Sequence, residues 1–351
     1  MNTGSQPLAS IVTPVYNGAE YLGECVESVL AQTYTNWEYT IVDNCSEDDT
    51  LAIAQKYAAR DPRVRVVRNG QFLSIVENHN HAARQISPLA KYCKFIFADD
   101  RLYPTCIEEM VRVAEEYPTI GLVGAYTTDG KAVRWHGPAD HNTKISGREI
   151  CRARLMGGHY VFGTMTSLLV RSDLIRKRPA LFNENNLQAD LEACFDILQE
   201  SDFGFVHQIL SFSRERANAT DSFAARLNSH RLADYVVFLK YGQRLLNEPE
   251  YLQHKRRLCR QYHQVLAHNF LRLRPRQFWQ FHREALATVG GRIEYRLLAA
   301  SIVVELVNQL SHPVRAFQRG RQWWSSKTRK QDAKKVDEYR ESFQKEATHV
   351  R

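Results

Sequence analysis

The chain has 351 residues, enough for about two domains of ordinary size, and its 44% hydrophobic and 25% charged content indicates a soluble protein with a real core. Its seven scattered cysteines contain no C-x-x-C pair, which excludes a structural zinc site and favours reduced thiols in the cytosol. The start shows no signal-peptide pattern, and the apolar segment 297–310 is too short to span a bilayer, so we expect no transmembrane helix.

Strand-like and helix-like segments alternate over the first 126 residues. Leu22, Cys25, Val26 and Val29 recur at helical spacing, which predicts a helix between the first two strands. A second helix is predicted over 51–59. The predicted strands cover residues 10–16, 37–43, 64–69, 94–100 and 120–126. This alternation predicts an α/β fold with a mostly parallel sheet flanked by helices, in which ligands bind at the carboxyl ends of the strands.

The pattern changes further along the chain. Residues 127–220 continue the α/β region, with a strand-like segment at 166–171 and a helix-like segment at 189–199. From about residue 222 the sequence is helical, and Leu258, Tyr262, Leu266, Phe270 and Leu273 are expected on one helix face ahead of Pro275. We therefore predict a domain at 1–220, a basic helical extension at 221–330 and a polar tail at 331–351.

Three groups of polar residues stand at predicted strand ends or helix starts. They are Asp43-Asn44, Asp99-Asp100, and Asp190 with Glu192. Taken singly, each group also has a purely structural interpretation. Asp43-Asn44 can form a turn, Asp99-Asp100 can form a capped turn before a helix opened by Pro104, and Asp190 with Glu192 can be an acidic helix N-terminus. On one edge of a sheet they favour a Mg²⁺ or Mn²⁺ site, because these ions bind one or two carboxylates together with substrate phosphates. A third carboxylate can then act as a base.

Three segments carry a resemblance to a known family. They are IVTPVYNGAEYLGECVESVLAQTYTNWEYTIVDNCSEDDT, NHAARQISPLAKYCKFIFADDRLYP and ADLEACFDILQESDFGFVHQILSFSR, in that order. Together they run from about residue 8 to residue 216. In sequence and spacing they resemble family 2 glycosyltransferases of the GT-A fold.

The resemblance implies an inverting glycosyltransferase with a nucleotide-sugar half at about 8–126 and an acceptor half at about 127–220. The implied donor is a UDP-, dTDP- or GDP-sugar, and the implied acceptor is a glycan or lipid-linked sugar in surface polysaccharide or glycolipid assembly. Asp99 and Asp100 would share ribose contact and the coordination of Mn²⁺ or Mg²⁺, and Asp190 would be the general base. The implied nucleotide-binding residues are Thr13, Pro14, Val15, Tyr16, Asn17, Asp43, Asn78 and Asp99.

The sequence departs from the family pattern at the metal and the base. Phe97 stands where many members carry the first Asp of D-x-D, so metal ligation depends on fewer carboxylates. Ala189 precedes the expected base where many members have an acidic residue, and Glu192 is a rival base.

Several further residues have two interpretations. Arg214 and Arg216, the second in place of a frequent His, can pair with the diphosphate or form salt bridges. His159 can line the acceptor pocket or be structural. Asn78 and Asn80 can close the donor pocket.

The extension is basic and aromatic. No Asp or Glu occurs between Tyr251 and Arg283 or between His312 and Gln331, although Tyr, Phe and Trp do. Such helices can bind an anionic membrane surface, or they can pack on the catalytic domain with their basic residues in water. No nucleic-acid-binding module is recognised, so we expect a cytoplasmic protein, peripheral on the inner face of the membrane, that binds no nucleic acid.

Two other function classes compete with a transferase. A dinucleotide-dependent oxidoreductase would need G-x-G-x-x-G after the first strand, where the sequence has PVYNGAEY. A non-catalytic nucleotide- or carbohydrate-binding relative of the same fold remains open because of Phe97.

Overall fold

The computed structural model describes residues 6–311 except 135, 139–141, 187 and 215–228. The chain divides into two compact units. The first comprises residues up to Ala233 together with Lys240–Tyr251, and the second comprises Asp234–Leu239 and residues from Leu252 onward. The predicted polar tail at 331–351 and Arg216 lie outside the described residues.

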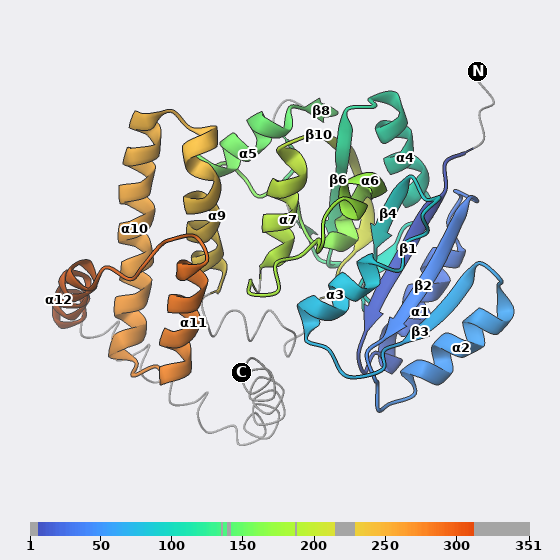
Figure 1. The fold of residues 1–351 in the computed structure, drawn as a ribbon, viewed down its shortest axis with the longest axis horizontal. Helices are drawn as coiled ribbons and strands as arrows, with labels where there is room; N and C mark the ends of the chain where they lie inside the picture. Colours follow the sequence, from blue (N-terminus) through green and yellow to red (C-terminus); the bar gives the residue numbers. More distant parts are fainter. Residues whose placement is uncertain (1–5, 135, 139–141, 187, 215–228, 312–351) are drawn as a thin grey trace. The chain divides into compact units, whose positions relative to one another are not determined.

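Among the described residues of the first unit, the strands form one ten-stranded sheet (Figure 1). Their order is β3-β2-β1-β4-β9-β6-β10-β5, with β7 beside β6 and β8 beside β10. The strands are β1 Ala9–Val15, β2 Trp37–Asp43, β3 Val64–Arg68, β4 Tyr92–Phe95, β5 Arg101–Leu102, β6 Ile120–Thr128, β7 Val133–Arg134, β8 Lys144–Ile145, β9 Leu168–Arg171 and β10 Asp202–Phe212. β1 to β4 are mutually parallel, as are β6 and β10, while β9 runs antiparallel between β4 and β6. The predicted mostly parallel sheet is confirmed.

Helices cover this sheet. They are α1 Ala19–Leu30, α2 Thr50–Arg60, α3 Ile75–Ala83, α4 Cys106–Glu116, α5 Gly147–Leu155, α6 Ser172–Arg176 and α7 Ala189–Leu198, with a 3₁₀ turn, η2, at Met165–Ser167. Buried residues of α1, α2 and α4 share one core with the strands, including Val26, Ala54 and Met110. α3 contacts β1 and β2, and α7 contacts β6. The alternating apolar pattern of the sequence therefore positions the strand ends that carry the polar groups.

The strand predicted over residues 94–100 is wrong at its end, because β4 stops at Phe95. Asp100 N donates to the Phe97 carbonyl at 2.9 Å and closes a turn. The next two residues pair as β5 with the far end of β10, which pulls the chain out of the β4 direction. Asp99 and Asp100 therefore lie in the turn between β4 and β5, and the predicted helix begins at Cys106.

The second unit is helical, as predicted. α9 Ser229–Leu245 and α10 Glu248–Leu271 each contribute to both units, and α11 Arg276–Ala287 and α12 Tyr295–Ser311 follow. Tyr262 is central to this unit: its ring lies 5.2 Å from that of Tyr235, and its hydroxyl is 2.7 Å from Nδ1 of His282. None of the helices within the described residues is long and apolar enough to cross a bilayer.

The predicted apolar face of α10 is only partly correct. Tyr262 and Leu266 are buried. Phe270 is 48% exposed, and Leu273 lies beyond the last residue of the helix and is 87% exposed. The helix ends before its periodic pattern does, because Leu273 adopts a left-handed backbone with φ of 52°.

Gly147→Ala tests the packing of α5 against the rest of the first unit. A Cβ at Gly147 would lie 2.1 Å from the Ser201 carbonyl oxygen and 2.3 Å from that of Leu198, so backbone would have to move. We expect a loss of about 1–3 kcal/mol in the free energy of unfolding, measured by urea denaturation. Gly70→Ala is the control, because a Cβ there meets nothing within 4 Å. An equal effect of both substitutions would contradict this packing.

Candidate active site

The ends of the parallel strands meet at one edge of the sheet, which we call the rim. Val15 at the end of β1 is in register with Asp43 at the end of β2, and Asp43 is in register with Arg68 at the end of β3. Tyr16 and Asn17 follow β1 directly, and Asn44 follows β2. The register thus brings together residues that the sequence places about 25 positions apart.

Asp43 carries a buried oxygen with no hydrogen bond. Its side chain is fully buried, and Oδ1 accepts a hydrogen bond from Ser46 N at 3.2 Å. Oδ2 forms an ion pair with Nε of Arg68 at 3.4 Å but accepts no hydrogen bond. A buried acceptor without a donor is costly, so this atom suits a ligand N–H. The sequence analysis did not identify Arg68.

Two exposed aromatic rings lie at the rim. The rings of Tyr16 and Phe72 meet edge to face, 4.9 Å apart, and nearly half of each side chain is exposed. Flat apolar surfaces of this kind can stack with a nucleobase. Sequence reasoning named Tyr16 and missed Phe72, which stands in a loop without a recognisable motif.

Other residues predicted to bind the nucleotide have side chains occupied within the protein. The Thr13 hydroxyl donates to the Ile96 carbonyl at 2.8 Å and lies 2.8 Å from the Tyr39 hydroxyl. Asn17 has a φ of 49°, and its Oδ1 accepts a hydrogen bond from Glu47 N at 2.9 Å. Pro14 and Val15 are buried in β1. These residues shape the rim mainly through their backbone.

The predicted asparagines form buried amide contacts. Asn69 Nδ2 donates to Oδ1 of both Asn44 and Asn78, at 2.8 and 2.9 Å. Asn80 exchanges hydrogen bonds with the backbone of Phe182, its Nδ2 donating to the carbonyl and its Oδ1 accepting from the N–H, both at 2.9 Å. Asn78 and Asn80 thus join the loops after β2 and β3 and the 182 segment to α3.

Asp100 is a buried carboxylate that joins three segments of the chain. Its Oδ2 accepts a hydrogen bond from the Thr166 hydroxyl at 2.6 Å. Its Oδ1 accepts hydrogen bonds from the Ser213 hydroxyl and from Arg214 N, both at 3.1 Å. Thr166 is in turn held by Lys94, whose fully buried Nζ donates to the Thr166 carbonyl at 2.5 Å. The signal for Lys94 in the sequence is a lysine inside the apolar run KFIF.

Burial raises the pKa of Asp100 to about 7, and the neighbouring Asp99 adds to this rise, while the hydrogen bonds from Thr166, Arg214 and Ser213 oppose it. Two adjacent carboxylates, one of them desolvated, favour a bound cation. Within the described residues no three His, Cys, Asp or Glu side chains cluster as a metal cage. The pair fits Mg²⁺ or Mn²⁺ only as a partial site that substrate phosphates would complete.

Arg214 supports the turn that carries Asp99. Its Nε donates to the Asp99 carbonyl at 3.3 Å, its Nη2 pairs with Glu24 at 3.0 Å, and its guanidinium lies over the Tyr21 ring. Phe97, at the position of the missing family Asp, stacks on His79 with ring centroids 5.2 Å apart. Burial lowers the pKa of His79 to about 4, so this ring is neutral at pH 7.

Asp190 and Glu192 have different surroundings. Asp190 lies in the first turn of α7, half-buried, with Oδ1 accepting from Leu191 N at 2.8 Å. Glu192 is buried and accepts from Asn186 at 2.8 Å and from Nζ of Lys240 at 2.7 Å. Burial by itself would raise the pKa of Glu192, but these hydrogen bonds outweigh it and the pKa is lowered.

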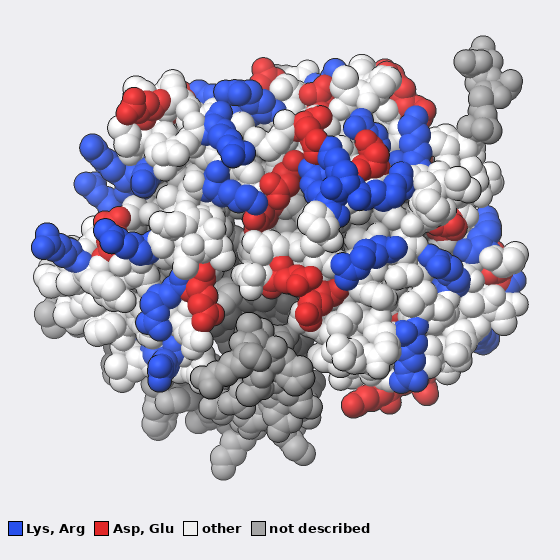
Figure 2. Space-filling model, in the orientation of Figure 1, with Lys and Arg blue, Asp and Glu red and all other residues white. Residues whose placement is uncertain are grey.

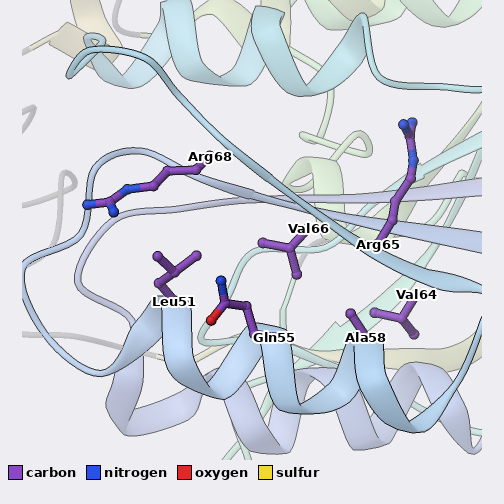
Figure 3. Close-up of a pocket in the computed structure, with 7 residues that line it drawn as sticks. All are labelled: Leu51, Gln55, Ala58, Val64, Arg65, Val66 and Arg68. Carbon is purple, nitrogen blue, oxygen red and sulfur yellow. The ribbon is translucent and has the colours of Figure 1, made fainter.

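His159 is exposed in the segment between α5 and η2 and stacks on His136, with ring centroids 4.2 Å apart. A separate hollow lies at the outer edge of the sheet, between α2 and β3 (Figure 3). It is lined by Leu51, Gln55, Ala58, Val64, Arg65, Val66 and Arg68. Only Arg68 belongs both to this hollow and to the rim.

Asp100→Asn should alter the pH dependence of stability in metal-free buffer. Since the folded-state pKa is raised from 3.8 to about 7, the folded protein keeps a proton that the unfolded chain releases, and stability falls as pH rises through this window. We expect the wild type to lose a few kcal/mol relative to Asp100→Asn between pH 5 and pH 8, measured by denaturation with EDTA. A relative gain of the wild type at pH 8 would contradict this.

Comparisons with known proteins bear on this site. Residues 10–177 match the model of the family described as "Glycosyl transferase family 2". A putative teichuronic acid biosynthesis glycosyltransferase, TuaG of Bacillus subtilis, is 33% identical over 114 residues, 32% of this chain and 44% of TuaG. The matched stretches span between 18% and 56% of the length of the first three curated relatives.

Solved structures share the fold. TarS residues 1–349 of S. aureus, in complex with UDP-GlcNAc, has a TM-score of 0.57 at 16% identity, with 82% of each chain covered. The mannosyltransferase PcManGT of Pyrobaculum calidifontis, in complex with GDP-Man and Mn²⁺, has a TM-score of 0.51 at 15% identity, covering 89% of this chain and 83% of that one. At these identities the likeness establishes the GT-A fold alone. Residues 10–177, which lie in the first unit, are therefore similar to glycosyl transferase family 2.

Proposed function

We propose that the chain transfers a sugar from a nucleotide-sugar donor to a hydroxyl of a glycan or lipid-linked acceptor, with inversion at the anomeric carbon. The observation that carries this proposal is the composition of the rim: a buried Asp43 whose Oδ2 accepts no hydrogen bond, exposed aromatic rings and the Asp99-Asp100 pair. The names of related proteins support a donor of the UDP or GDP type and a role in polysaccharide assembly.

In this proposal the base of a UDP, dTDP or GDP donor packs against Tyr16 and Phe72 and donates an N–H to Oδ2 of Asp43. Stacking on an aromatic ring is tolerant of base identity, whereas the carboxylate selects a base with an N–H at its edge. Asp99 contacts the ribose. Asp99 and Asp100 would hold Mn²⁺ or Mg²⁺, which when bound neutralises charge on the departing diphosphate.

Asp190 is the proposed general base. The acceptor oxygen forms a bond to the anomeric carbon, the bond from that carbon to the diphosphate oxygen breaks with its electron pair, and the hydroxyl proton passes to Asp190. The contacts of Glu192 support this assignment, since a carboxylate bonded to Lys240 and two asparagines is a poor base. Glu192 instead stiffens the first turn of α7.

Donor binding is the first test. A nucleotide at about 100 times its dissociation constant adds roughly 2.7 kcal/mol to stability, which a melting experiment detects. We expect one nucleoside diphosphate to raise the melting temperature more with Mn²⁺ than without it, and Asp100→Asn to abolish the metal-dependent part. Asp43→Asn should weaken binding about tenfold or more, because an amide NH₂ would then face the base N–H.

Asp49→Asn is the matched control, because Asp49 is exposed in the loop that follows Asp43. It should bind the nucleotide like the wild type. If no nucleotide binds, or if Asp43→Asn and Asp49→Asn behave alike, the rim is not a donor site.

Asp190→Asn separates a transferase from a non-catalytic relative. We expect turnover to fall about 10²–10⁴-fold while donor affinity is kept, measured by sugar-transfer kinetics and calorimetry. Glu192→Gln should lower the melting temperature and leave a larger share of turnover, because it acts through the position of α7. If Asp190→Asn leaves turnover unchanged, the chain is better explained as a non-catalytic binding relative. If Glu192→Gln lowers turnover more than Asp190→Asn does, Glu192 is the base.

For localisation we propose a cytoplasmic protein that is peripheral on the inner face of the membrane, with a lipid-linked acceptor as the reason. The basic character of the second unit supports this placement. Nucleic acid is not part of the proposal.

A further inference from the structure

The turn between α10 and α11 has an unusual residue at a strained position. Leu273 N donates to the Phe270 carbonyl at 2.9 Å, and Arg274 N donates to the Asn269 carbonyl at 3.3 Å, which together close the C-terminus of α10. Leu273 has the left-handed φ of 52° that this helix ending requires. Glycine or asparagine normally occupies such a position, because a larger side chain there costs free energy.

The same leucine gains nothing from burial. Its side chain is 87% exposed, and Phe270 beside it is 48% exposed, whereas Tyr262 and Leu266 earlier in the helix are buried. A residue that is disfavoured by its backbone and by its exposure does not stabilise the isolated unit. An apolar partner would compensate for both costs.

α12 also carries exposed apolar residues, and it contacts the last turn of α10. Nδ1 of His268, about half a turn before Phe270, is 3.2 Å from the Glu305 carboxylate and brings α12 alongside. On α12, Val303 and Val304 are 60% and 52% exposed. The apolar surface of the second unit is therefore larger than one side chain.

The charge around this turn is strongly positive. Residues 252–311 contain ten Lys and Arg and three Glu, and Arg272 and Arg276, on either side of Leu273, are exposed. Figure 2 shows several Lys and Arg side chains, interspersed with Asp and Glu, on the visible face of the helical part of the chain. Exposed arginines around apolar residues match a surface with phosphates outside and hydrocarbon beneath.

We propose that this turn, residues 270–276, is a membrane anchor that binds bilayers containing anionic lipids. Leu273 and Phe270 enter the acyl region, and Arg272 and Arg276 bind headgroup phosphates. A nucleic acid would explain the arginines but not an exposed leucine in a strained backbone. This inference rests on the proposed function in one respect, namely that a lipid-linked acceptor gives the anchor its purpose.

Binding of the full chain to vesicles tests the anchor. We expect it to co-sediment with vesicles that contain phosphatidylglycerol and not with phosphatidylcholine alone. Leu273→Asn should weaken binding about tenfold or more, because the buried apolar area is lost. Since asparagine accepts the left-handed backbone, this variant should melt at the same or a higher temperature. A loss of binding then has no origin in unfolding.

Leu89→Asn is the matched control, because Leu89 is 83% exposed in the first unit, and it should bind vesicles like the wild type. Unchanged vesicle binding by Leu273→Asn overturns the proposal, as does equal binding to both vesicle types. So does a dimer, detected by analytical ultracentrifugation, that Leu273→Asn dissociates, since the leucine would then contact a second copy. Binding of the turn to RNA in preference to vesicles would also overturn the proposal.

The nucleotide melting shift on the same preparations separates the two proposals. If nucleotide still raises the melting temperature but the chain does not bind vesicles, the membrane-anchor proposal is overturned and the transferase proposal is unaffected. Vesicle binding without any nucleotide shift supports the anchor and contradicts the transferase.

Discussion

The hydrogen bonds on Asp100 hold the candidate site together. This carboxylate is almost wholly buried, and it accepts from Thr166 next to β9 and from Ser213 and Arg214 at the end of β10. It thereby fixes the turn after β4 against segments that are 66 and more than 110 residues away. Without these donors a desolvated carboxylate beside another carboxylate would destabilise the fold by several kcal/mol. The turn keeps its shape because the donors converge there.

The negative charge of Asp100 is only partly stabilised by its surroundings. Protein hydrogen bonds stabilise Asp100 only in part, which is why its pKa stays above the ordinary value for an aspartate. The buried Lys94 holds the carbonyl of Thr166; burial lowers the pKa of its ammonium group, and the charge of Asp100 opposes this in part. In the proposed function, a cation held by Asp99 and Asp100 would add counter-charge at this point, and this would link the stability of the turn to the proposed chemistry.

The two carboxylates of α7 illustrate how environment separates similar residues. Glu192 is surrounded by donors from the 183–186 segment and from Lys240, while Asp190 faces the less enclosed start of the helix. Lys240 belongs to a part of the chain that lies beyond the matched family domain but folds with it. The extension is therefore not an independent addition: residues 240–251 complete the first unit.

Local pattern was enough to predict the order of strands and helices, the mostly parallel sheet, the helical extension and the likeness to family 2 glycosyltransferases, because periodicity and motif spacing depend on near neighbours in sequence. Asp43 and Asp100 were also identified this way, since polar residues after apolar strands are a local signal. Phe72, Arg68, Thr166 and Lys94 were not, because their importance comes from partners in other strands.

The end of β4, the different surroundings of Asp190 and Glu192, and the exposure of Leu273 were decided only by the tertiary structure. Each depends on contacts between residues that are distant in sequence, or on a backbone conformation that apolar spacing alone does not reveal. The sequence by itself determined the type of fold and the kind of residues at the rim. Long-range hydrogen bonding and burial determined which of those side chains are enclosed within the protein and which are exposed at its surface.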